Sequence, residues 1–138
     1  MKKYIFLLIP VLGLLAFAAF KPSENKHIEF SKLSYSDALK KAKNEKKIVF
    51  VDAYADWCGP CKMMERNTFS NAEVADYFNS HFINLKMDVE TAEGNAIAED
   101  FGVTALPTLL FIGSDGKAIK KTIGYMDAER LMAEAKSL

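Results

Sequence analysis

The sequence predicts a single α/β domain at residues 28–138, in which a βαβ half is followed by a ββα half. Short apolar runs rich in β-branched residues, such as residues 48–53, have the length and composition of strands buried on both faces of a sheet. These runs alternate with longer segments that begin at a capping residue and show helical spacing of apolar side chains. A chain of this length can bury one hydrophobic core.

The first half contains three expected strands and three expected helices. Residues 28–30 are expected to form a weak edge strand, and Ser36 is expected to cap a helix that reaches residue 44. Residues 48–53 then form the central strand, and Pro60 suits the first turn of the helix that follows. The next helix should begin at a capping box in residues 70–73 and end near residue 79, ahead of a strand at residues 82–87.

The second half reads as helix, hairpin and helix. A helix at residues 92–100 should stop before Gly102, because glycine readily ends a helix. Residues 108–112 and 118–122 are expected to pair through a turn at residues 114–116. Asp127 has the position of a cap for the last helix.

The N-terminus indicates export. Lys2 and Lys3 precede an uncharged apolar run at residues 4–20, and residues 16–18 offer a small-residue cleavage pattern, which is typical of a secretory signal. As a helix the run would reach only about 26 Å, so an uncleaved membrane anchor is the alternative. We therefore expect a signal peptide or anchor at residues 1–20, a linker at residues 21–27, and a domain in the periplasm or on the outer face of the cytoplasmic membrane.

The balance of basic and acidic residues argues against a nucleic-acid-binding protein, which would need an excess of basic residues. Without residues 1–18, which carry Lys2 and Lys3, 16 basic and 18 acidic residues remain. We expect no nucleic-acid partner.

The strongest functional signal is the sequence WCGPC at residues 57–61, which holds both cysteines of the chain. Two cysteines at this spacing lie on one helical turn, where one thiolate can resolve a mixed disulfide formed by the other. Cys58 is expected at the helix N-terminus, where unpaired N–H groups and the helix dipole stabilise a thiolate. Cys58 is thus the expected nucleophile, and Cys61 the more deeply buried resolving residue.

Three other interpretations compete with redox exchange. A zinc half-site would need two more ligands, yet His27 and His81 are far apart in the sequence and belong to no paired motif. A purely structural disulfide would close a loop too small to stabilise the fold much. The third is an adaptor or copper-handling module, because two thiolates can hold copper(I).

Two separated segments carry a family resemblance. Residues 51–62 (VDAYADWCGPCK) resemble the active-site segment of thioredoxins, and residues 101–111 (FGVTALPTLLF) resemble their cis-proline segment. Residues 54–58 and 68–70 are also similar to the C-terminal domain of the DsbD-type thiol:disulfide interchange reductases. The resemblance implies the thioredoxin fold, a central mixed sheet flanked by helices on both faces in the order βαβαβαββα.

The resemblance also implies roles for individual residues. Asp52 would be the buried carboxylate that takes and returns the proton of Cys61, and burial at a strand end would raise its pKa. Leu106-Pro107 would be a cis peptide whose backbone pairs with the substrate chain. The implied substrate-contacting set is Trp57, Gly59, Pro60, Leu106, Pro107 and Gly124. Where thioredoxins commonly have a lysine near the buried aspartate, this sequence has Asn84, and Lys86 is the expected substitute on the same face.

These features together predict an exported protein-disulfide reductase. We expect no cofactor beyond the dithiol and no metal, and we expect a monomer. The sequence shows no flavin or nicotinamide fingerprint, so the electrons must come from another thiol protein, membrane-bound or soluble. Partners are disulfide-containing proteins, and a dedicated role in cytochrome c maturation is the alternative. The motif leaves the direction of electron flow open.

Overall fold

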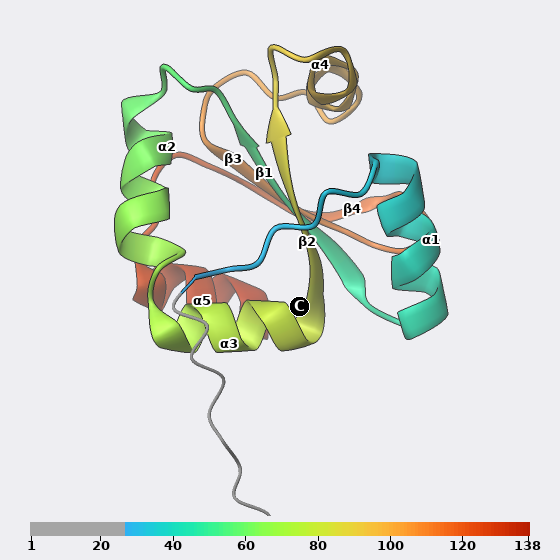
Figure 1. Cartoon of the computed structure of the whole chain (residues 1–138), viewed down its shortest axis with the longest axis horizontal. Helices are drawn as coiled ribbons and strands as arrows, with labels where there is room; N and C mark the ends of the chain where they lie inside the picture. The colour runs from blue at the N-terminus through green and yellow to red at the C-terminus, as the bar shows by residue number, and fades with distance from the viewer. Residues whose placement is uncertain (1–26) are drawn as a thin grey trace, which may run out of the picture.

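The computed structural model describes residues 27–138 as one mixed sheet with helices on both faces (Figure 1). None of the helices within this range combines the length and apolar character needed to cross a membrane. The predicted signal or anchor at residues 1–20 and nearly all of the linker at residues 21–27 lie outside the described residues. The elements, in chain order, are α1 (Tyr35–Glu45), β1 (Ile48–Tyr54), α2 (Gly59–Met63), the π-helical segment η1 (Met64–Thr68), α3 (Ala72–His81), β2 (Phe82–Asp88), α4 (Ala92–Asp100), β3 (Thr108–Ile112), β4 (Ala118–Ile123) and α5 (Ala128–Lys136).

The sheet has the strand order β2-β1-β3-β4. β1 is parallel to β2 and antiparallel to β3, and β4 pairs antiparallel with β3. The central strand β1 is buried from Val49 to Ala53, as its continuous apolar run predicts. The chain enters the dithiol segment directly from the end of this buried strand.

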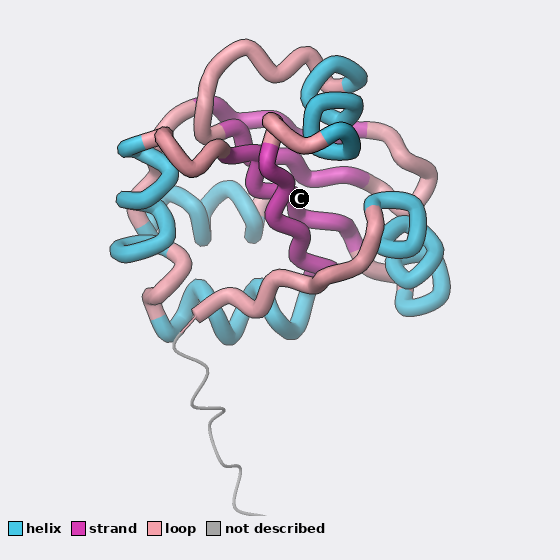
Figure 2. Tube along the Cα trace, turned by 45° about the horizontal axis from the view of Figure 1, so that its top comes forward, coloured by secondary structure: helices cyan, strands magenta, loops and turns pink. Residues whose placement is uncertain are grey.

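Figure 2 shows helices on both sides of the sheet. Two clusters of buried apolar residues pack between the sheet and these helices. On one face, α3, α5 and the segment after the dithiol pack on an aromatic cluster centred on Phe50, whose ring lies 4.8 Å from that of Phe78 and 5.2 Å from that of Phe111. On the other face, α1 and α4 pack on aliphatic residues such as Val51 and Leu110. The alternation of these residues along each strand produces the two layers.

The predicted edge strand at residues 28–30 is wrong. Only Ser31 makes a bridge to β2, with its N–H donating to the Asn84 carbonyl over 2.8 Å. Phe30 instead turns into the core, where its ring meets Phe69 edge-on at 5.5 Å. The N–H groups of Ile28 and Glu29 donate to the Phe69 carbonyl and to Asn79 Oδ1 instead of to β2, so the observed order lacks the first strand of the predicted βαβαβαββα.

Two predicted helix caps are wrong by one or two residues. Ser34, rather than Ser36, caps α1 by accepting a hydrogen bond from the Asp37 N–H. Asn71 caps α3 by accepting from the N–H groups of Glu73 and Val74, while Ser70 donates to a backbone carbonyl of the preceding turn. Neighbouring polar side chains could each accept a hydrogen bond from the first turn of a helix. The residue with an extended backbone conformation directly before the helix, Ser34 or Asn71, is the one that does so.

The second half of the chain confirms its predicted elements. α4 and β3 have the predicted bounds, and β4 extends one residue further than predicted. Gly102 and Gly116 have φ values of 59° and 80°, in the left-handed region that glycine tolerates. Asp127 caps α5 through the Arg130 N–H.

Candidate active site

The dithiol lies where the chain leaves β1 and enters α2. Cys58 is the N-cap of α2, and its Sγ accepts a hydrogen bond from the Cys61 N–H over 3.2 Å. The two cysteines form a disulfide with a Cα–Cα distance of 5.3 Å. Pro60 occupies the first turn of α2, where its missing N–H costs no hydrogen bond. Both Gly59 and Pro60 are exposed beside the disulfide.

The two sulfurs are equally sheltered in this oxidised form. Cys58 is 3% exposed and Cys61 is 5% exposed, so the expectation that Cys61 is the more buried of the two is wrong for the disulfide state. Exposure therefore does not distinguish the two cysteines here, whereas their positions differ: Cys58 is the N-cap of α2 and Cys61 lies within the helix.

Asp52 is a buried carboxyl near the C-terminal end of β1. It is 1% exposed, and neither of its carboxyl oxygens has a hydrogen-bond partner among residues 27–138. Burial raises the pKa of Asp52 from 3.8 to about 7; the charge of Lys86 opposes this rise and that of Glu65 adds to it. A carboxyl with this pKa can both take and return a proton near neutrality.

Lys86 and Glu65 connect Asp52 with the dithiol helix. Lys86 is the cross-strand neighbour of Asp52 in β2, and its Nζ binds a Glu65 carboxylate oxygen at 2.5 Å. The same Nζ lies 4.4 Å from the centre of the Tyr54 ring. A cavity of about 110 Å³ is lined by these three residues and by Cys61, so Lys86 and Cys61 border the same small opening.

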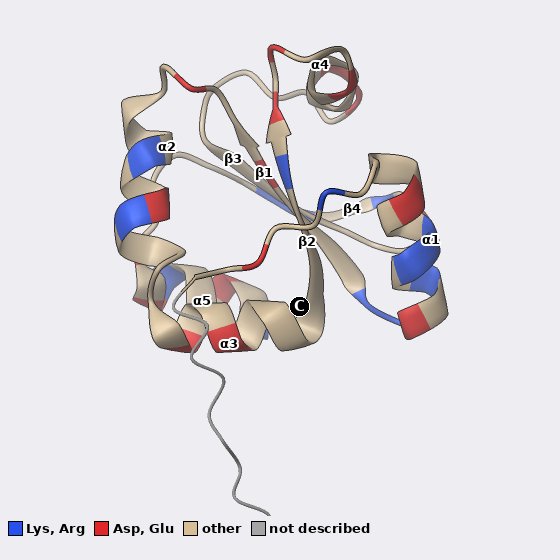
Figure 3. Ribbon diagram, in the orientation of Figure 1, with Lys and Arg blue, Asp and Glu red and all other residues tan. Residues whose placement is uncertain are grey.

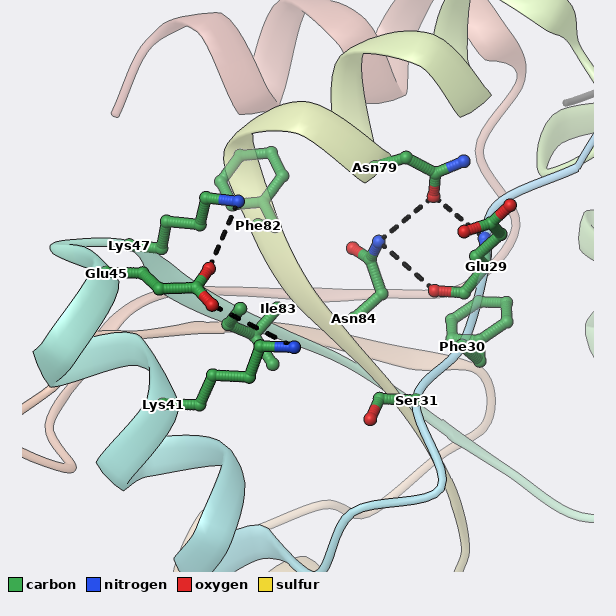
Figure 4. A pocket seen from close by; sticks show the side chains of 10 residues that line it. All are labelled: Glu29, Phe30, Ser31, Lys41, Glu45, Lys47, Asn79, Phe82, Ile83 and Asn84. Atoms are coloured by element: carbon green, nitrogen blue, oxygen red, sulfur yellow. Dashed lines mark hydrogen bonds and ion pairs between the residues drawn. The ribbon is translucent and has the colours of Figure 1, made fainter. Parts of the chain in front are cut away.

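Asn84 does not face Asp52. It pairs across the strands with Phe50, and its Nδ2 donates to the Phe78 carbonyl and to Asn79 Oδ1, each over 3.3 Å. Figure 4 shows this amide pointing toward Asn79 and Glu29, along the N-terminal segment. Lys86 therefore provides the positive charge near the buried aspartate, and Asn84 anchors the chain that crosses the edge of β2.

The Leu106–Pro107 bond is cis, as predicted. The Pro107 carbonyl accepts a hydrogen bond from the Gly124 N–H over 2.8 Å, and this bond joins the start of β3 to the end of β4. Gly124 has a φ of 93°, and an added Cβ would meet no atom within 4 Å. Backbone conformation, rather than lack of space, explains glycine at this position.

Trp57 is not a core residue. Its side chain is 69% exposed, and its Nε1–H donates to Glu90 Oε1 over 2.8 Å. The indole is thus fixed on the surface directly before Cys58. Its exposure agrees with the predicted role in contacting partners.

Sequence reasoning missed Glu65 and Glu90. Glu65 follows Cys61 by four residues, one helical turn, and this spacing was a signal that it would lie near the buried dithiol. Glu90 offered no such signal, because the loop after β2 approaches Trp57 only in the folded chain. Within the described part of the chain, no three histidine, cysteine, aspartate or glutamate side chains converge as metal ligands would.

A mixed four-stranded sheet, a capping cysteine bonded to its partner one turn later, and a buried carboxyl in the strand that leads to them define a class. This is the class of thioredoxin-fold thiol-disulfide oxidoreductases. Residues 35–138 match the sequence profile of the family described as "Thioredoxin-like domain". The chain belongs to this family.

Individual relatives agree with this assignment. The chain is 34% identical over 123 residues to the thiol:disulfide interchange protein DsbD of Haemophilus influenzae (strain PittEE), a match that covers 83% of this chain and 21% of that protein. The chain thus spans about a fifth of the length of this relative. A Bacteroides thetaiotaomicron protein solved in solution, named as a candidate disulphide-isomerase, is 47% identical with a TM-score of 0.72, and the match covers 80% of this chain and 91% of the other.

A third comparison extends to the C-terminal domain of Neisseria meningitidis DsbD in its oxidised form. That structure is 25% identical with a TM-score of 0.64, and the match covers 80% of this chain and 97% of that domain. The similarity to a DsbD C-terminal domain agrees with the resemblance read from the sequence around the dithiol.

Proposed function

We propose that this protein is an exported thiol:disulfide oxidoreductase that reduces disulfides in partner proteins. The observation that carries the proposal is the Cys58–Cys61 disulfide at the start of α2, with Cys58 Sγ accepting the Cys61 N–H. After reduction, the same N–H would stabilise a thiolate on Cys58. The thiolate is the form of cysteine that attacks disulfides.

The first step is attack of the Cys58 thiolate on one sulfur of the partner's disulfide. The partner's S–S bond breaks, one of its sulfurs leaves as a thiolate, and the other is bonded to Cys58. The exposed Trp57 and the loop at Leu106-Pro107 flank this position and would hold the partner chain.

The second step releases the partner. Asp52, ionised above its pKa of about 7, accepts the Cys61 proton, and the Cys61 thiolate attacks the Cys58 sulfur. The mixed disulfide breaks, and the partner leaves with its second sulfur as a thiolate. Two electrons have moved to the partner, and the protein now holds the Cys58–Cys61 disulfide.

Turnover outside the cytoplasm requires a source of electrons. The export signal at residues 1–20 supports this location, and the chain carries no cofactor fingerprint from which electrons could come. A membrane-bound or soluble thiol protein is therefore the proposed donor, and the protein acts as a monomer on its disulfide partners.

The test separates the two cysteines. We expect the wild-type protein to accelerate insulin reduction by dithiothreitol, Cys58→Ser to lose this activity, and Cys61→Ser to accumulate mixed disulfides with partner proteins in its native cell. The Cys58→Ser/Cys61→Ser double variant is the control and should capture nothing. If Cys61→Ser captures nothing and the wild type does not exceed dithiothreitol alone, the proposed function is wrong.

A further inference from the structure

A second cavity lies against Trp57, the residue directly before Cys58. It has a volume of about 290 Å³, and Trp57 forms one wall. The remaining wall comes from the loop after β2, from α4 and from the loop before β3, with Val89, Ala98, Val103 and Leu106 as its apolar members. Because Leu106 precedes Pro107, the cavity adjoins the position at which the partner chain is held. It has the size and lining to take one apolar side chain.

Two carboxylates are held at the rim of this cavity. Glu90 accepts the Trp57 Nε1–H over 2.8 Å, and Glu99 accepts a hydrogen bond from Asn95 Nδ2 over 2.9 Å. Trp57 and Asn95 both line the cavity. Each carboxylate is therefore one hydrogen bond away from the wall, and both are exposed to an approaching partner.

The charge around this rim has one sign. Residues 87–106, which run from the end of β2 through α4 to the loop before β3, contain five acidic residues and no lysine or arginine. Figure 3 shows this as red on α4 and on the loop that leads into it. Lys121, which contacts the end of α4, directs its Nζ to the carbonyls of Phe101 and Gly102 over 3.0 and 3.2 Å. Lys121 adds one positive charge at the end of α4, so a cationic partner would still meet a net excess of negative charge on α4 and the loop before it.

We infer that this surface selects the substrate: the cavity binds an apolar side chain next to the target disulfide, and the acidic rim attracts lysine or arginine residues that flank it. The inference rests on the proposed function and names the class of disulfide that the dithiol prefers. Rim charges act mainly on the rate of association, so the preference should weaken as salt screens them.

The test uses the full protein and two synthetic peptides, each with one intramolecular disulfide and a leucine beside its cysteine. Lysines flank the leucine in one peptide, and glutamates replace them in the other. Trp57, the only tryptophan, reports oxidation of the reduced protein by stopped-flow fluorescence. We expect the lysine peptide to react about fivefold or more faster at low salt, with a difference that shrinks at 0.5 M salt. Replacing leucine by alanine in the lysine peptide should slow it.

Charge-only variants of the protein locate the effect. Glu90→Gln and Glu99→Gln keep an oxygen that can accept the hydrogen bond, and each should slow the lysine peptide about two- to fivefold. Glu129→Gln, which removes an exposed carboxylate on α5, is the matched control and should leave the rate unchanged. Equal rates for the two peptides, or no effect of the rim variants, overturn this inference and leave the proposed function standing. If neither peptide is reduced, the proposed function fails and the inference fails with it.

Discussion

Lys86 lies directly across from Asp52 on the parallel strands β2 and β1, and its Nζ is held by Glu65 from η1, the segment after the dithiol helix. The two side chains share one face of the sheet, because neighbouring residues in register project to the same side. The buried carboxyl therefore has one cation and one anion near it, and these oppose each other in setting its pKa. The charge environment of Asp52 thus depends on two residues from different elements of the fold.

The first prediction concerns stability and Asp52. Its pKa is about 7 in the folded protein, above the ordinary 3.8, so the folded state binds this proton more tightly than the unfolded state. The contribution of Asp52 to the free energy of unfolding is therefore greatest below about pH 4. This contribution falls progressively as the pH rises to 7, by about 4 kcal/mol in total.

Asp52→Asn should remove this loss. Denaturant unfolding of the oxidised protein should show the variant close to wild type at pH 4 and more stable by a few kcal/mol at pH 8. A constant difference between the two proteins across this range would contradict a raised pKa for Asp52.

The second prediction concerns the two charges beside Asp52. Lys86→Met removes the cation that favours the ionised form, so the pKa of Asp52 should rise further; Glu65→Gln removes the anion, so it should fall. Carboxyl-carbon NMR titration of the oxidised protein measures both shifts. Lys62→Met is the control, because Lys62 lines the same cavity but is not among the groups that shift Asp52. Shifts of the same sign in the two test variants would rule out opposing roles.

The third prediction concerns the start of α1. Ser34→Ala removes the side-chain oxygen that accepts the Asp37 N–H over 3.2 Å, and it should lower the free energy of unfolding by about 1 kcal/mol. Ser36→Ala is the matched control at an exposed position and should change it by less than about 0.5 kcal/mol. Chemical denaturation measures the free energy of unfolding of both variants. A larger decrease for Ser36→Ala than for Ser34→Ala would show that Ser36 caps α1, as the sequence predicted, and that Ser34 does not.

The sequence by itself determined the strand β1, the dithiol helix that follows it and the second half of the chain. These elements depend on local properties: a continuous apolar run, a proline in a first helical turn, and glycines at positive φ. The roles proposed for Cys58 and Cys61 depend on the same local pattern, because a capping position is defined within one turn of helix.

Only the tertiary structure decided which residues surround that pattern. The register of β1 against β2 placed Lys86, not Asn84, beside Asp52, and packing brought Glu90 to Trp57 from a loop 33 residues away. It also turned Phe30 into the aromatic core and left residues 28–30 without a strand. These relationships join segments that are distant in sequence, and they form only when the whole sheet is assembled and its faces are buried.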